Sequence, residues 1–136
     1  MKALDTNILV RYYTQDDPRQ ARIALRILKE EEALYVPRTV LIELYFVLRY
    51  GKQYHFEQAR IHAVLTHLLG LGNVNIEQAN AVETALRYYQ QGIDFADALH
   101  LASSQHCSVL LTFDDRKFAR RARRLGLKPP VTVPSA

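Results

Sequence analysis

Apolar residues along this chain form either short runs or longer segments in which they recur every three or four positions. The short runs predict strands at residues 2–5, 34–36, 74–76 and 108–112, with a last edge strand at 131–133. The longer segments predict helices at about 6–13, 18–32, 39–50, 56–69, 77–91, 94–106 and 115–125. Because strands alternate with helices, we expect an α/β fold with a central parallel sheet of about four to five short strands flanked by helices.

The composition is that of one globular domain, residues 1–136, with 49% hydrophobic and 24% charged residues and no dividing linker or repeat. The single cysteine, Cys107, allows no internal disulfide, which fits a reducing compartment, and we expect it to be a small buried residue. No apolar stretch is long enough for a membrane span or a signal peptide, so we expect a cytoplasmic protein. The net charge of +4 favours a polyanionic partner only weakly.

Asp5 ends the first apolar run, immediately before the first predicted helix. Ligands bind at the carboxyl ends of strands in open α/β sheets, which makes Asp5 a candidate site residue. Asp5, Thr6 and Asn7 are also good helix caps, and for Asp5 taken alone capping is the favoured interpretation.

A second acid follows the predicted strand 108–112, which we expect to be buried. Asp114 lies two residues after Thr112, a strand-end hydroxyl that mirrors Thr6. Asp115 comes next and is a natural cap for the helix predicted to follow. Spacing alone leaves open which of the two acids faces a site.

Two further carboxylates interrupt apolar helices. Glu43 lies in a segment, 40–48, that is apolar nearly all round, so we expect it to be buried. Such a buried charge requires an ion pair, hydrogen bonds or a metal, and a structural salt bridge to an arginine explains Glu43 equally well. Asp97 lies one turn inside a helix whose N-cap we assign to Asp94, so capping does not explain Asp97.

Four carboxylates, Asp5, Glu43, Asp97 and Asp114, would repel one another if they converged without a cation. A hard divalent metal, Mg²⁺ or Mn²⁺, resolves that repulsion because it prefers oxygen ligands. The sequence has no CxxC pair, no HExxH motif and no glycine-rich phosphate loop, which argues against zinc and nucleotide sites of those kinds.

The stretches Leu4–Asn7, Glu43 in its apolar helix, Phe95–Ala98 and Leu111–Asp114, in this order, resemble the PIN-domain nucleases. The closest resemblance is to the toxin half of VapBC-type toxin–antitoxin pairs, and it covers essentially the whole chain. It implies a single-stranded RNA endonuclease that uses Mg²⁺ or Mn²⁺, forms a homodimer and is inhibited by a cognate antitoxin protein. It further implies the catalytic and metal-binding acids Asp5, Glu43, Asp97 and Asp114, supported by hydrogen bonds from Thr6, Asn7 and Thr112.

With no Ser-His-Asp or Cys-His arrangement visible, a metal-activated water is the natural nucleophile, and in-line attack would leave a 5′-phosphate and a 3′-hydroxyl. Basic residues should hold the RNA, and Arg116, Lys117 and Arg120 crowd the last helix. A solvated helix face explains these cations equally well.

Two other functions compete with the nuclease. A non-catalytic PIN-fold module would bind RNA or protein without cutting, although it would not need the intact set of acids. A phosphotransferase would use Asp5 as its nucleophile, but such folds typically place a second acid where this chain has Asn7.

Overall fold

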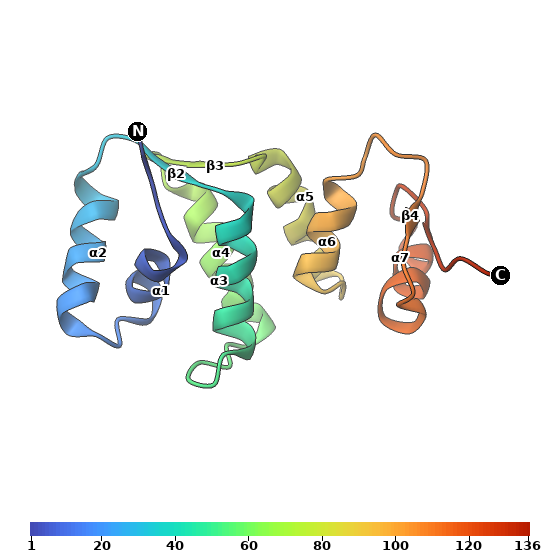
Figure 1. The fold of residues 1–136 in the computed structure, drawn as a ribbon, viewed down its shortest axis with the longest axis horizontal. Helices are drawn as coiled ribbons and strands as arrows, with labels where there is room; N and C mark the ends of the chain where they lie inside the picture. The colour runs from blue at the N-terminus through green and yellow to red at the C-terminus, as the bar shows by residue number, and fades with distance from the viewer. The chain divides into compact units, whose positions relative to one another are not determined.

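The computed structural model describes residues 1–136. Its chain divides into two compact units, which we call unit 1 (Met1–Ala79) and unit 2 (Asn80–Ala136). In Figure 1, unit 1 runs from the blue N-terminus to the green segments, and unit 2 continues through yellow to the red C-terminus. None of the helices is both long enough and apolar enough to cross a membrane.

Unit 1 is built on a three-stranded parallel sheet in the order β1-β2-β3. Its strands are β1 (Lys2–Ala3), β2 (Leu34–Val36) and β3 (Val74–Ile76). Its helices are α1 (Thr6–Thr14), α2 (Pro18–Glu30), α3 (Arg38–Tyr50) and α4 (Gln58–Gly70). Helix α1 contacts both α2 and α3, which places the first turn after β1 beside α3. The core between these elements is aliphatic, and its fully buried side chains include Leu9, Leu34, Leu41, Leu44, Leu48, Ile61, Leu65 and Leu68.

Unit 2 carries the remaining elements of the chain. They are α5, which begins at the unit boundary (Ala79–Gln90), α6 (Phe95–Ala102), β4 (Leu110–Leu111), the π-helix η1 (Asp115–Ala119), α7 (Arg120–Arg124) and β5 (Val131–Thr132). Strands β4 and β5 pair in parallel, and η1 and α7 both contact β5. Phe118, Ala119 and Ala122 are the buried side chains of η1 and α7, whose other residues are mostly basic. Gly126 ends this segment with a φ of +68°, a conformation that side-chain-bearing residues rarely adopt.

The predicted α/β fold with short parallel strands and flanking helices is confirmed. Its strands are divided between a three-stranded and a two-stranded sheet, where the sequence pattern suggested one central sheet. Hydrophobic runs indicate where strands lie but carry little information about which strands pair. This holds especially for β1 and β4, because strands of two residues offer almost no pattern that could select a partner.

Two predictions of burial in the second half of the chain are wrong. The segment 108–112 is not a buried strand, because Leu111 is 63% exposed and β4 pairs with β5 alone in its sheet. Cys107 is exposed as well, because α6 ends at Ala102 and the chain continues in turns where a longer helix was expected.

Candidate active site

Asp5 occupies the N-cap position of α1, directly after the strand pairing of β1. The backbone N–H of Leu4 donates to the carbonyl of Tyr35 at 2.9 Å, which fixes the chain up to the residue before Asp5. The Asp5 side chain makes no capping hydrogen bond to the helix. Instead it is exposed and accepts a hydrogen bond from Asn7 Nδ2 at 3.4 Å. The carboxylate is therefore not used to cap the helix, although the residue stands at the cap position.

Glu43 is exposed, so the prediction that α3 buries it is wrong. The same side of α3 also exposes two aromatic residues, Phe46 at 45% and Tyr50 at 56%. The segment is apolar nearly all round because it places aromatic rings on its outer side as well as aliphatic residues in the core. None of the ion pairs in the structure involves Glu43, which removes the salt-bridge explanation.

Thr6 connects the end of β1 to α3. Its hydroxyl donates to Glu43 Oε1 at 3.1 Å, and the Thr6 side chain itself is buried. A buried hydroxyl needs a partner, and here that partner is the carboxylate of Glu43. Thr6 thus restrains Glu43, while Asn7 contacts Asp5, so both predicted supporting residues of unit 1 contact a candidate acid.

Asp94 and Asp97 lie at the start of α6, and the structure gives them different roles. Asp94 Oδ2 accepts a hydrogen bond from the backbone N–H of Asp97 at 3.2 Å, which confirms Asp94 as the N-cap. Asp97 is half-buried between neighbours that are themselves buried, such as Ala96 and Ala98. Its carboxylate accepts no hydrogen bond and forms no ion pair.

Burial, together with the negative charges of Asp94 and Asp114, raises the pKa of Asp97 to about 6, while His100 partly opposes the rise. A carboxyl group with this environment is harder to ionise than an exposed one, because water is displaced and like charges lie nearby. The sequence pattern indicates the capping role of Asp94 but not this electrostatic effect on Asp97. The signal for this effect was the separation of three residues between Asp94 and Asp97, which puts both side chains on one face of the helix.

The doublet Asp114-Asp115 differs from the prediction in which of the two residues caps the helix. Asp114 Oδ1 accepts from the backbone N–H of Lys117 at 3.0 Å and caps η1, so the assignment of the cap to Asp115 is wrong. Asp115 is the first residue of η1 and forms an ion pair with Arg120 at 2.9 Å. Thr112 Oγ1 accepts from the backbone N–H of Asp114 at 3.0 Å, so the hydroxyl shapes the turn that carries this acid. Of the two acids, Asp114 is the one whose charge acts on Asp97.

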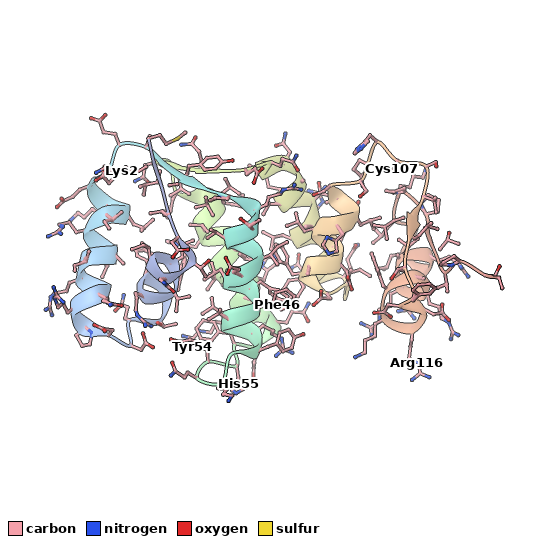
Figure 2. The ribbon with its side chains drawn as sticks, viewed as in Figure 1. Lys2, Phe46, Tyr54, His55, Cys107 and Arg116 are labelled. Atoms are coloured by element: carbon pink, nitrogen blue, oxygen red, sulfur yellow. The ribbon has the colours of Figure 1, made fainter.

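The basic residues that follow are not equivalent. Arg116 and Lys117 are exposed and take part in no ion pair, and Figure 2 shows the Arg116 side chain pointing away from the ribbon. Arg120 is held by Asp115, and Arg121 donates to the carbonyl of Gly92 at 2.9 Å. Of the three cations predicted to contact substrate, two are available in the structure and the third already has a partner.

A cavity that sequence analysis did not predict lies beside Asn7, between α1 and α2. Its volume is about 250 Å³, and its lining includes Ile8, Ile23 and the polar side chains of Arg11 and Gln20. Arg11 is fixed by hydrogen bonds to Gln20 at 2.7 Å and to Asp16 at 3.1 Å. No spacing in the sequence indicates this arrangement, because it depends on the angle at which α1 meets α2.

The candidate acids are distributed equally, with Asp5 and Glu43 in unit 1 and Asp97 and Asp114 in unit 2. Neither unit by itself groups three or more Asp, Glu, His or Cys side chains so that they could hold a metal. The available donors are carboxylates with hydroxyl and amide neighbours, which is the set that Mg²⁺ and Mn²⁺ prefer. The raised pKa of Asp97 beside Asp94 and Asp114 also fits a place that a cation would stabilise. The chemical types of these donors therefore suit a hard divalent metal.

Comparison with known proteins decides the family. The model of the PIN domain matches residues 2–124, which include all four candidate acids. The chain belongs to the PIN-domain family. This PIN domain is also 28% identical over 133 residues to the VapC ribonuclease of Aquifex aeolicus (strain VF5), with 94% of each chain covered. The resemblance to VapC-type PIN domains, drawn from four short motifs, is confirmed.

Proposed function

We propose that this PIN domain is a metal-dependent endonuclease of single-stranded RNA and the toxin of a toxin–antitoxin pair. The similarity to a VapC ribonuclease supports the reaction class. The observation that carries the proposal is Asp97, a half-buried carboxylate with no hydrogen-bond partner and with two other acids acting on it. Such a group costs stability in the free protein, which is typical of residues retained for catalysis or metal binding.

Asp5, Glu43, Asp97 and Asp114 together would hold Mg²⁺ or Mn²⁺. When bound, the metal supplies Lewis acidity, which lowers the pKa of a water molecule and offsets charge on the phosphate. Neighbouring side chains of the protein restrain the orientation of these acids. Thr6 restrains Glu43 by its hydrogen bond of 3.1 Å, and Asn7 holds Asp5 at 3.4 Å. Thr112 restrains the turn that carries Asp114, because its Oγ1 accepts a hydrogen bond from the backbone N–H of Asp114.

The reaction is an in-line hydrolysis of the phosphodiester bond. The oxygen of water bonds to phosphorus, and the bond from phosphorus to the 3′ oxygen breaks. One of the carboxylates accepts the proton that water gives up and later releases it to solvent, and the leaving 3′ oxygen takes a proton from solvent. The products are a 5′-phosphate and a 3′-hydroxyl.

The RNA backbone is held by Arg116 and Lys117, the two exposed cations that follow Asp114 and form no ion pair. Arg120 contributes less, because it must leave Asp115 to reach a phosphate. Binding that depends on such cations weakens as salt concentration rises, since each phosphate contact releases counterions.

The similarity to a VapC ribonuclease extends the proposal to partners. We expect a homodimer in the cytoplasm and a cognate antitoxin protein that binds the toxin and prevents it from reaching RNA. An antitoxin that covers the acids should offer them a cation, because a carboxylate cluster is best neutralised by a charged partner.

The test is cleavage of an end-labelled single-stranded RNA with Mg²⁺, with Mn²⁺ or with EDTA. Asp97→Asn should lower the rate at least about 100-fold, as expected for loss of a catalytic carboxylate. Asp115→Asn is the matched control, since it removes an acid of the same doublet as Asp114 that is paired with Arg120, and it should cut normally. Cleavage that survives both EDTA and Asp97→Asn contradicts the proposal. Salt-sensitive binding without any cutting would instead support a non-catalytic RNA-binding module.

A further inference from the structure

Phe113 is the most exposed large hydrophobic residue of the chain, with 85% of its surface accessible. It stands between Thr112 and Asp114, at the end of the extended segment that contains β4. Isolated exposed apolar residues are common, but a phenyl ring this exposed beside a candidate catalytic acid is informative, because it contributes almost nothing to the core.

The backbone on both sides of Phe113 is held in place. The N–H of Thr112 donates to the carbonyl of Thr132 at 3.0 Å, which ties the segment to β5. The N–H of Asp114 donates to Thr112 Oγ1, and the carboxylate of Asp114 accepts from the N–H of Lys117, both at 3.0 Å. The ring is therefore presented on a fixed turn, so little conformational entropy is lost when a ligand packs against it.

The charged residues that follow Phe113 in the sequence fit one kind of ligand. Arg116 and Lys117 follow within four residues, and both are exposed and unpaired. Asp114 follows Phe113 directly in the sequence, and its charge acts on Asp97. An aromatic surface beside cations is the combination that binds single-stranded nucleic acids, in which bases stack on the ring and phosphates meet the cations.

We propose that Phe113 stacks on an unpaired base of the RNA, next to the phosphate that is cut. This inference rests on the proposed nuclease function and adds to it a specific base-contacting residue. Stacking is tolerant of sequence because every base has an aromatic face, so Phe113 fixes the position of the strand and selects unpaired over paired RNA.

An apolar partner surface is the competing occupant, because Leu111 and Phe113 lie two residues apart and both are exposed. A surface of that kind does not explain why two unpaired cations follow the ring. Leu111 provides a matched control, since it lies two residues before Phe113, is 63% exposed and has no aromatic face.

The chain contains no tryptophan, so Phe113→Trp introduces a single fluorophore at the position in question. With EDTA present to prevent cleavage, adding a single-stranded RNA oligonucleotide should quench this fluorescence. The same oligonucleotide made of abasic nucleotides should quench it little. Phe113→Ala should bind the normal RNA about 10-fold more weakly and the abasic RNA as tightly as wild type, whereas Leu111→Ala should match wild type with both.

Several outcomes would overturn the proposal. If wild type and Phe113→Ala bind normal RNA equally and Phe113→Trp is not quenched, the ring does not stack, while the nuclease function stands. If Phe113→Ala loses affinity for normal and abasic RNA alike, or Leu111→Ala loses as much, the ring has a structural or interface role. A wild-type protein that binds no single-stranded RNA contradicts both this inference and the proposed function.

Discussion

Replacing Asp97 by Asn should stabilise the metal-free protein at neutral pH, although it removes a candidate catalytic residue. The Asp97 carboxyl is half-buried beside Asp94 and Asp114, and its pKa rises from 3.8 to about 6. Its ionised form is therefore disfavoured in the folded state relative to the unfolded state. Asn keeps nearly the same shape and carries no charge, so it avoids this cost.

The size of the effect follows from the shift in pKa. A rise of about two units corresponds to ~3 kcal/mol, because each unit is worth about 1.4 kcal/mol. Solvent screening at a half-exposed group reduces this by about half. The position of Asp97 in the first turn of α6 offsets a further ~0.5 kcal/mol, since the helix dipole favours a negative charge there. The net gain for Asp97→Asn is about 1 kcal/mol, or about 3 to 4 °C in Tm for a chain of this size.

The pH dependence gives the sign of the effect. Between about pH 4 and pH 6, the folded state keeps the proton of Asp97 while the unfolded state has lost it, so the stability of the wild type falls as pH rises. Above about pH 6 the group is ionised in both states and the penalty is constant. The difference between Asp97→Asn and wild type should therefore be largest at pH 7 to 8 and shrink as pH falls towards 4.

The assay is urea unfolding in EDTA at several pH values, repeated with Mg²⁺. A divalent metal should stabilise wild type more than Asp97→Asn, because the ionised carboxylate is then paired with a cation. A variant that is less stable than wild type at pH 7.5 without metal, or a difference that does not change between pH 4 and 7.5, would refute the reasoning.

Two other substitutions test the supporting residues. Thr6→Val keeps the shape of the side chain but removes the hydrogen bond to Glu43, so we expect a loss of about 1 kcal/mol in unfolding free energy and slower RNA cleavage, with Thr6→Ser close to wild type in both. A Thr6→Val protein that cuts at the wild-type rate would show that Glu43 needs no such restraint. Replacing Arg116 and Lys117 by Ala should weaken RNA binding. It should also reduce the slope of the logarithm of the binding constant against the logarithm of the salt concentration by about 1.4, that is, about 0.7 for each lost phosphate contact. An unchanged slope in a binding titration would mean that these cations do not touch phosphates.

The sequence predicted strand positions and helix caps well where local chemistry determines them. The strands 34–36 and 74–76 match to the residue, because short apolar runs there are bounded by polar residues or proline. Asp94 caps its helix as predicted, with a hydrogen bond of 3.2 Å.

The predictions that failed depend on tertiary structure. Glu43 was expected to be buried because it lies in a helix with apolar residues on nearly every side. The periodicity of apolar residues does not show which of them a helix leaves exposed, and α3 exposes Phe46 and Tyr50 on the side of Glu43. The helix cap was assigned to Asp115, where the structure has Asp114, because the chain enters a π-helix there, which the sequence does not signal. The division of the strands into two sheets was likewise invisible, since pairing partners are chosen in three dimensions.

The measurement that tests the proposed metal site most directly is a Mn²⁺ titration monitored by electron paramagnetic resonance. It compares wild type, Asp5→Asn, Asp97→Asn and the double variant. Asp5 belongs to unit 1 and Asp97 to unit 2. If both acids hold the same metal, each single substitution should weaken Mn²⁺ binding about 10-fold or more, and the double variant should lose less than the sum of the two. Wild-type affinity in either single variant would contradict the assignment of these acids to one metal.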